Sequence, residues 1–321
     1  MAAIGLLFPG QGAQKPGMGG DLAEGCEPVR RVFQIANERL GLELDRICFE
    51  GPDERLARSD VAQPAILTVS VASLRALEEQ AGTAMPPVAG SAGLSLGEYT
   101  ALVAAGALAF EDAVEVVRHR GIYMQEACDA NPGTMCSILG LEDEQVEESC
   151  ARAREEVGEG VWPANYNCPG QLVISGREKA VEEAARLCAE LGARRTIRLN
   201  VAGAFHTELM RSAAEKLAPV LDETEFHEPS HPVVANVTGC PVKGPDEIRR
   251  RLIEQVHSPV RWRSCMEWFL GQDVERFYEV GPGSVLRGLL RRIDRSAACA
   301  AVSDASQVAD VASDWQKGDT A

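Results

Sequence analysis

The run Ala92-Gly93-Leu94-Ser95-Leu96-Gly97-Glu98 decides the fold. It contains a G-x-S-x-G pentapeptide between a strand-like stretch of small residues, 87–92, and an alanine-rich helical stretch, 97–107. This pattern is typical of a nucleophile elbow, a sharp strand-to-helix turn that exposes a serine hydroxyl and leaves backbone N–H groups beside it. A side chain at either glycine would collide with the neighbouring strand or block the substrate. The pattern therefore predicts an enzyme that forms acyl esters on Ser95; the alternative is a glycine-rich loop with an incidental serine.

Strands and helices alternate on both sides of this turn, which predicts a parallel sheet and an α/β fold class. Before the turn and just after it, we expect a strand at 4–8, helices from Pro28 to Leu40 and from about Pro64, and helices at 97–107 and 111–127. Beyond residue 200 we expect helices at 207–222, 246–256, 262–270 and 284–293, and strands at 232–237 and 277–280. Residues 1–127 and 200–304 are thus predicted to form a large, α/β-hydrolase-like catalytic subdomain.

Residues 128–199 follow a different pattern. The expected elements are a strand at 134–139, a helix at 142–155, strands at 161–167 and 171–175, a helix at 178–191 and a strand at 194–199. This β-α-β-β-α-β order predicts an inserted ferredoxin-like small subdomain at 128–199. Residues 305–321 are polar and small, and we expect them to form a flexible tail.

Composition excludes several classes of protein. With 321 residues, 45% of them hydrophobic, the chain can bury a full core in two subdomains. It has no apolar run near the ~20 residues of a membrane span and no signal-peptide pattern at its start, so we expect a cytoplasmic protein. The ten cysteines have no C-x-x-C spacing, which predicts that most are core thiols rather than parts of disulfides or a zinc site. A net charge of −16 excludes nucleic acid and anionic membranes as partners.

A serine nucleophile needs a base and an oxyanion hole, and the sequence offers candidates for both. His206 is the best of five histidines, because it lies where the inserted subdomain returns to the large one, a place where pockets form. Alternatively, His206 is an ordinary surface or packing residue. The first oxyanion donor is the N–H of Leu96, which belongs to the elbow, and the glycine-rich turn at 8–14 is a candidate for the second.

The chain resembles the malonyl-CoA:acyl carrier protein transacylases of fatty acid synthesis and the acyltransferase domains of polyketide synthases. The likeness covers about residues 4–293 and rests on motifs in the family's order. These are Pro9-Gly-Gln-Gly-Ala-Gln14, Gln63-Pro-Ala65, Gly93-x-Ser-Leu-Gly-Glu98, Arg120-Gly-x-x-Met-Gln125, Asn165-x-Asn-x-Pro-Gly-Gln171, Gly203-Ala-Phe-His206, Ser258-Pro-Val-Arg-Trp262 and Glu279-Val-Gly-Pro-Gly283.

The resemblance implies a role for each candidate. Ser95 would be the nucleophile and His206 the general base and acid, with the N–H groups of Gln11 and Leu96 forming the oxyanion hole. The family orients its histidine with a main-chain carbonyl, and the matching residue is Gln255. Two further residues match positions that line the family's site, Asn167 and Phe205.

Substrate choice would depend on Arg120, whose guanidinium can hold a malonyl carboxylate with two parallel hydrogen bonds. Phe205 would leave less room for the extra methyl of a methylmalonyl group. Asn167 could alternatively be a turn residue beside Pro169. The chain departs from the family at Leu94, the residue before the nucleophile, which is usually histidine in the family. This change puts strict malonyl preference in doubt.

The implied reaction is ping-pong transfer of malonyl from malonyl-CoA to the phosphopantetheine thiol of acyl carrier protein, with no metal or redox cofactor. Three alternatives stay open: a hydrolase that uses the same dyad, a trans-acting polyketide acyltransferase, and a non-catalytic carrier-binding protein. An acidic carrier could dock on a basic surface, for which the candidate residues are Arg261, Arg287, Arg291 and Arg292.

Overall fold

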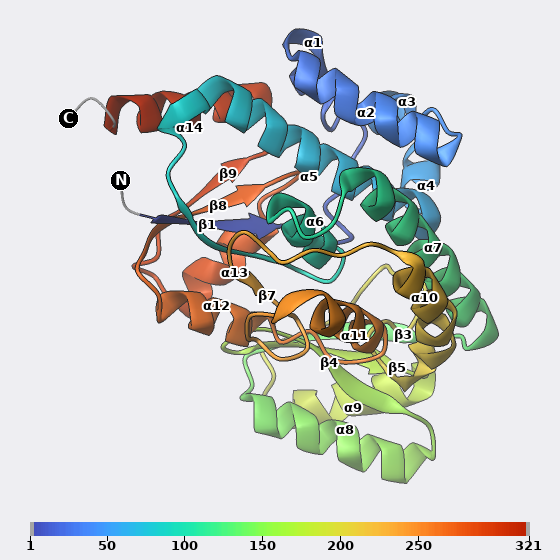
Figure 1. The fold of residues 1–321 in the computed structure, drawn as a ribbon. Coiled ribbons are helices and arrows are strands. Elements are labelled where there is room, and N and C mark those ends of the chain that lie inside the picture. Colours follow the sequence, from blue (N-terminus) through green and yellow to red (C-terminus); the bar gives the residue numbers. More distant parts are fainter. Residues whose placement is uncertain (1–2, 319–321) are drawn as a thin grey trace.

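The computed structural model describes residues 3–318, which form a mixed α/β fold around two sheets (Figure 1). The larger sheet is parallel throughout and has the strand order β7-β2-β1-β8-β9. Its strands are β1 (Ala3–Phe8), β2 (Val88–Gly93), β7 (Val233–Val234), β8 (Val274–Val280) and β9 (Cys299–Val302). β1 lies in the centre of this sheet, paired with β2 on one side and β8 on the other.

The position of β1 explains why its sequence is apolar throughout. Leu6 and Phe8 join one hydrophobic cluster, and Leu7, which points to the opposite face, joins another. Both faces of the strand are therefore covered, as is usual in a parallel sheet.

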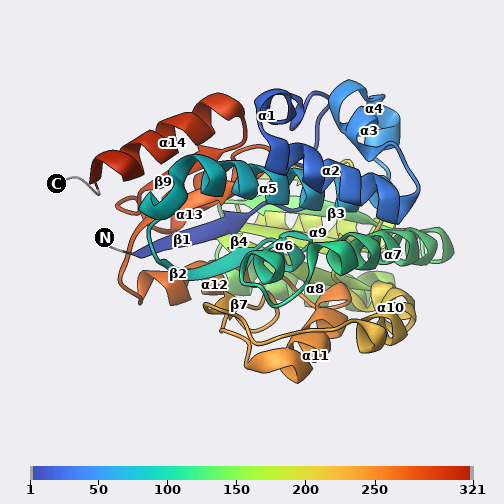
Figure 2. The same cartoon turned by 45° about the horizontal axis from the view of Figure 1, so that its top comes forward.

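Helices cover both faces of this sheet (Figures 1 and 2). The cluster of Leu6 and Phe8 includes residues of α2 (Glu27–Leu40), α5 (Ser59–Ala81), α6 (Gly97–Ala104), α7 (Phe110–Ala130) and α14 (Ala305–Gly318). The cluster of Leu7 includes residues of α12 (Trp262–Leu270) and α13 (Val285–Ile293). The remaining helices of the larger part are α1 (Gly20–Gly25), α3 (Leu44–Glu50), α4 (Asp53–Leu56), α10 (Arg211–Glu223) and α11 (Gly244–Val256), with short 3-10 turns at Gly82–Ala84 and Glu208–Met210.

The second sheet is antiparallel, with the order β4-β5-β3-β6. Its strands are β3 (Thr134–Leu139), β4 (Val161–Cys168), β5 (Gln171–Gly176) and β6 (Arg195–Arg198). Helices α8 (Asp143–Val157) and α9 (Glu178–Glu190) cover the face that lies at the bottom of Figure 1, over a core of their own. Main-chain hydrogen bonds between Val260 and strand β4, at Ala164 and Tyr166, join this sheet to the segment before α12.

Most of the expected elements are present, and some boundaries differ. Helix α5 begins at Ser59 rather than near Pro64, which lies within the helix. Strand β7 is limited to Val233–Val234, because a turn closed by the hydrogen bond from Gly239 N–H to Ala235 O follows it at once.

The prediction of a flexible tail is wrong for residues 305–318, which form helix α14. Strand β9 was also not predicted from the sequence. Helix α14 packs on α5, and the buried side chains that face inward are Val308, Val311, Ala312 and Trp315. At this spacing the four side chains lie on one face of the helix and form an apolar stripe. The Trp315 indole N–H also donates to the Tyr278 hydroxyl at 2.8 Å. Residues 319–321 of the expected tail lie outside the described residues.

All ten cysteines carry free thiols, and seven of them are buried. Between residues 3 and 318, none of the helices has the length and apolar character needed to span a bilayer.

Candidate active site

Ser95 lies in the turn between the end of β2 and the start of α6, with a positive φ of 53°. The two flanking glycines are sterically required. A Cβ on Gly97 would lie 2.2 Å from the Phe8 carbonyl oxygen of the neighbouring strand, and a Cβ on Gly93 would lie 1.9 Å from the Gly97 carbonyl. The sequence-based expectation of a strand-to-helix turn closed by two glycines is therefore confirmed.

His206 meets Ser95 across 111 positions of sequence, with its Nε2 atom 2.8 Å from the serine Oγ. Its other ring nitrogen, Nδ1, is 2.9 Å from the main-chain oxygen of Gln255. A carbonyl oxygen can only accept, so Nδ1 carries the proton and Nε2 is free to accept the serine proton. Like Ser95, His206 has a positive φ, 60°, in the connection after β6.

The His206 imidazole is 4% exposed, and this environment keeps it uncharged. Burial lowers its pKa to about 4, and the nearby positive charge of Arg120 acts in the same direction. At neutral pH the ring is therefore a neutral acceptor, as a general base must be.

Arg120 is a cation inside the protein. It projects from α7, is 2% exposed, and donates to Ser95 Oγ at 2.9 Å, to Gln63 Oε1 at 2.8 Å and to Gln255 Oε1 at 3.0 Å. All three acceptors are uncharged, and among residues 3–318 the salt bridges include none to Arg120. Because burying a charge without a directly paired carboxylate is costly, this guanidinium is suited to an anionic ligand.

Asn236, which the sequence did not single out, holds the turn from outside. Its Oδ1 accepts from the Ser95 N–H at 2.6 Å, and its Nδ2 donates to the Gly93 carbonyl at 2.7 Å. The side chain thus bridges both ends of the elbow and fixes the direction of the serine. Its position after β7 could be read from the sequence, but its partners, more than a hundred residues away, could not.

Glu98 is a second residue that the sequence did not single out, although it belongs to the Ser95 motif. It is 2% exposed, and its Oε2 accepts from Gln255 Nε2 at 2.7 Å and from the Asn236 N–H at 3.0 Å. Burial raises its pKa to about 7, although these hydrogen bonds favour the ionised form. The carboxylate therefore joins α6 to two other segments around Ser95.

Ser95, Arg120 and His206 border a cavity of about 810 Å³. Six of the residues expected at the site line it, namely Gln11, Ser95, Arg120, Asn167, Phe205 and His206, and so does the atypical Leu94. Asn167 is 8% exposed and reaches the cavity from β4. Leu96 directly precedes α6, so its N–H belongs to the unpaired N-terminal set of that helix. Gln255 lies behind His206, at the end of α11.

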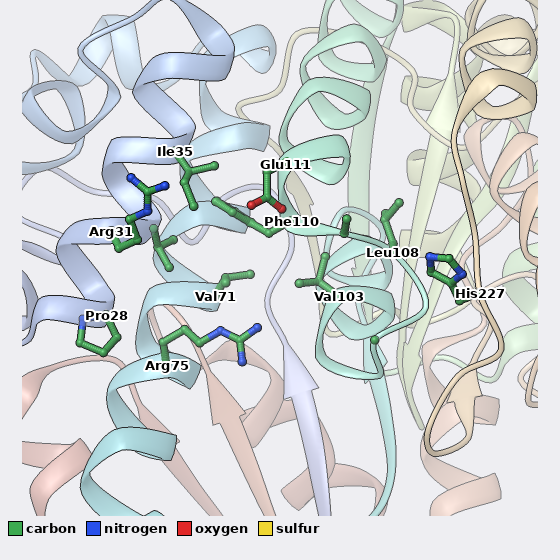
Figure 3. Close-up of a pocket in the computed structure, with 13 residues that line it drawn as sticks. Pro28, Arg31, Ile35, Val71, Arg75, Val103, Leu108, Phe110, Glu111 and His227 are labelled. Atoms are coloured by element: carbon green, nitrogen blue, oxygen red, sulfur yellow. The ribbon is translucent and has the colours of Figure 1, made fainter.

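A smaller cavity, of about 490 Å³, lies between α2, α5 and the connection from α6 to α7 (Figure 3). Arg31, Arg75, Glu111 and His227 surround its apolar floor. It contains neither Ser95 nor His206, and the candidate site is therefore the larger cavity.

Comparison with known proteins gives consistent results along the whole chain. Residues 6–321 match a family described as the acyl transferase domain. The chain is 46% identical over 304 residues to the malonyl CoA-acyl carrier protein transacylase of Bacillus subtilis, covering 95% of this chain and 94% of the relative.

Solved structures agree with this similarity. An acyl carrier protein S-malonyltransferase from Vibrio cholerae superposes with a TM-score of 0.92 at 43% identity, covering 97% of this chain and 100% of the other. A malonyl-transacylase in complex with its type II polyketide synthase acyl-carrier protein gives a TM-score of 0.93 at 40% identity, covering 98% and 100%.

Proposed function

Since the chain belongs to the acyl transferase family of malonyl CoA-acyl carrier protein transacylases, we propose that it carries out their reaction with the residues around Ser95. It transfers the malonyl group from malonyl-CoA to acyl carrier protein and so supplies units for fatty acid synthesis. One observation carries the assignment of the site. A buried guanidinium, which forms no salt bridge to a carboxylate among residues 3–318, lies 2.9 Å from the Oγ of a serine that is itself 2.8 Å from a neutral imidazole.

In the first half-reaction, Ser95 Oγ attacks the thioester carbonyl while its proton passes to His206 Nε2. The N–H groups of Gln11 and Leu96 stabilise the oxyanion. When the tetrahedral intermediate collapses, the carbon–sulfur bond breaks and His206 gives its proton to the CoA sulfur. The products are a malonyl ester on Ser95 and free CoA.

In the second half-reaction, the phosphopantetheine thiol of the carrier gives its proton to His206 and attacks the ester carbonyl. Collapse breaks the bond to Ser95 Oγ, which regains the proton from His206. The sequence of two acyl transfers through one covalent intermediate is ping-pong catalysis.

Arg120 selects the acyl group in this scheme. Its planar guanidinium can hold the malonyl carboxylate with two parallel hydrogen bonds, whereas an acetyl group offers it no partner. Asn167 and Phe205 line the same cavity, and we assign them to contact with the acyl group. Phe205 would restrict the space available to a branched acyl chain.

We also propose the finer description of the fold. The nucleophile after β2 of a parallel sheet supports an α/β-hydrolase-like part formed by residues 1–127 and 200–304, with helix α14 packed on it. The order β4-β5-β3-β6 supports a ferredoxin-like part at residues 128–199. Ten free thiols are compatible with a reducing compartment, and we place the protein in the cytoplasm.

The acceptor must approach the open side of the cavity. Val285, 57% exposed, lines this cavity at the start of α13, and Arg287 and Arg291 are exposed on the same helix. Arg261 is exposed as well and lies over the Tyr166 ring, and Arg292 donates to Gln171. We propose this basic helix as the docking surface for the acidic carrier.

Covalent labelling tests the proposed function. The protein is mixed in parallel with radiolabelled malonyl-CoA, acetyl-CoA and methylmalonyl-CoA, and we expect a stable label from malonyl-CoA that Ser95→Ala abolishes. Ser91→Ala is the matched control, because Ser91 is buried on β2, the strand that leads to Ser95, but its hydroxyl donates to the Ala101 carbonyl. Uptake of label by Ser95→Ala would show that the nucleophile is another residue.

A carrier of a polyketide pathway is the second candidate acceptor, because one similar structure is a transacylase bound to such a carrier. Chasing the labelled protein with both kinds of acyl carrier protein decides between them. Release of free malonate that is faster than transfer to either thiol would instead indicate a hydrolase.

A further inference from the structure

Glu98 is a buried carboxylate to which the mechanism assigns no step. It lies in the first turn of α6, and both groups that donate to it, Gln255 Nε2 and the Asn236 N–H, belong to uncharged amides. Burying a carboxylate is costly, so a polar residue at this place needs a reason beyond packing.

The Gln255 side chain has one orientation that satisfies all of its neighbours. Its Oε1 accepts from Arg120 at 3.0 Å, while its Nε2 donates to the Ser95 carbonyl at 3.0 Å and to Glu98 at 2.7 Å. A guanidinium can only donate, and an ionised carboxylate can only accept. If the amide rotated, its NH₂ group would face the guanidinium and Arg120 would lose an acceptor.

Glu98 is thus the far end of a chain of hydrogen bonds that leads through Gln255 to Arg120. The other acceptors of Arg120, Gln63 Oε1 and Ser95 Oγ, are uncharged. A carboxyl oxygen of Glu98 can accept from Gln255 Nε2, and it therefore holds the amide in the orientation that Arg120 needs.

We propose that Glu98 is a positioning residue for acyl selectivity, which fixes Arg120, through the side-chain amide of Gln255, where a malonyl carboxylate binds. This inference rests on the proposed function of Arg120. Glu98 touches no substrate, and its contribution is expected in the preference between acyl groups rather than in the reaction of Ser95 itself.

The test is the ratio of malonyl to acetyl labelling rates. Glu98→Met removes the acceptor at nearly constant volume and is expected to lower this ratio about ten- to a hundredfold by misplacing the guanidinium. Glu98→Gln keeps one carbonyl oxygen that can accept from Gln255, and is expected to retain the ratio within about threefold.

A double-mutant cycle shows whether the effect passes through Gln255. Gln255→Met removes the amide while its main-chain carbonyl still faces His206. We expect the double variant Glu98→Met/Gln255→Met to have the ratio of Gln255→Met alone, because both changes break the same link. Independent, additive losses would contradict the proposed route.

Glu279→Met is the matched control. Glu279 is another fully buried carboxylate, but it accepts from the N–H groups of Leu286 and Arg287. We expect this variant to unfold at a lower temperature with its labelling ratio unchanged.

Two results would overturn the proposal: a wild-type ratio in folded Glu98→Met, or equal losses of malonyl and acetyl labelling. If Glu98→Met does not fold, Gln255→Met carries the test, with the same expected loss of ratio. Wild-type protein without malonyl preference would contradict the proposed function instead, so the two failures can be told apart.

Discussion

Replacing Arg120 by methionine separates recognition of the acyl group from catalysis. The change removes a buried guanidinium, 2% exposed, together with its hydrogen bonds to Ser95, Gln63 and Gln255. Two buried amide oxygens lose a donor, at a cost of about 1–3 kcal/mol each. Removing the desolvation cost of the buried guanidinium offsets this by a similar amount, and we expect the melting temperature to change by no more than about 5 °C.

The effect on malonyl transfer is expected to be far larger. Truncating one partner of a buried, hydrogen-bonded charge pair costs about 2–5 kcal/mol. At about 1.4 kcal/mol for each factor of ten, the malonyl-labelling rate should fall roughly 30- to 4,000-fold. Acetyl labelling should fall far less, because an acetyl group makes no ion pair with Arg120 and loses only the effect of the guanidinium on Ser95 and His206.

The assay compares the initial rates of covalent labelling by malonyl-CoA and acetyl-CoA. Arg120→Lys keeps the charge without the planar fork, and is expected to fall between wild type and Arg120→Met. Arg118→Met is the matched control, because Arg118 lies on the same helix but donates to the Leu40 carbonyl. A malonyl preference that survives in Arg120→Met would refute the role of the guanidinium.

Three further predictions concern the base, the last helix and the turn. Burial and a neighbouring guanidinium lower the pKa of His206 to about 4. The malonyl-labelling rate should therefore stay constant as the pH falls from neutral and be lost only as the pH falls through about 4. A labelling profile with its midpoint at pH 6.5, the ordinary pKa of histidine, would contradict the buried, neutral imidazole. Trp315→Ala should lower the unfolding free energy in urea by about 3–5 kcal/mol without changing the specific activity of the folded protein, whereas a helix that is only loosely attached would tolerate it. Gly97→Ala would place a Cβ 2.2 Å from the Phe8 carbonyl oxygen, and we expect it to lower the rate of malonyl transfer about a hundredfold. The control is Gly25→Ala, whose Cβ would meet open space and which should keep full activity.

The sequence predicted the elements that a local pattern determines. The glycines of the G-x-S-x-G motif imply close backbone approach, and the structure has that approach at Gly93 and Gly97. His206 was identified by its place at the junction of two patterns, and the chain brings it to Ser95 across 111 positions. Steric constraints and chain topology leave few alternatives for the turn and for the placement of His206 beside it.

The supporting hydrogen bonds could not be predicted in the same way. Asn236 and Gln255 reach the elbow from segments 141 and 160 positions away, and nothing in their local sequence specifies those partners. Glu98 was visible as part of the motif, but an exposed and a buried glutamate look alike until the fold places them.

Helix α14 was missed for a different reason. Its small and polar residues suggested a tail, although the spacing of Val308, Val311 and Trp315 was a helical signal that could have been used. A short amphipathic helix is stabilised by the surface it covers, and that surface is formed by residues from distant parts of the chain, such as Tyr278.

The backbone conformation of Ser95 and His206 lowers the stability of the fold but is needed for function. Both residues have left-handed φ values, 53° and 60°, a conformation that costs an L-amino acid about 1–2 kcal/mol and costs glycine almost nothing. Glycine at either position would therefore relax the chain while removing the reactive group. A thermostabilisation campaign that ranks variants by melting temperature alone would be drawn toward inactive proteins at these two sites, and libraries built on this scaffold should keep both positions fixed.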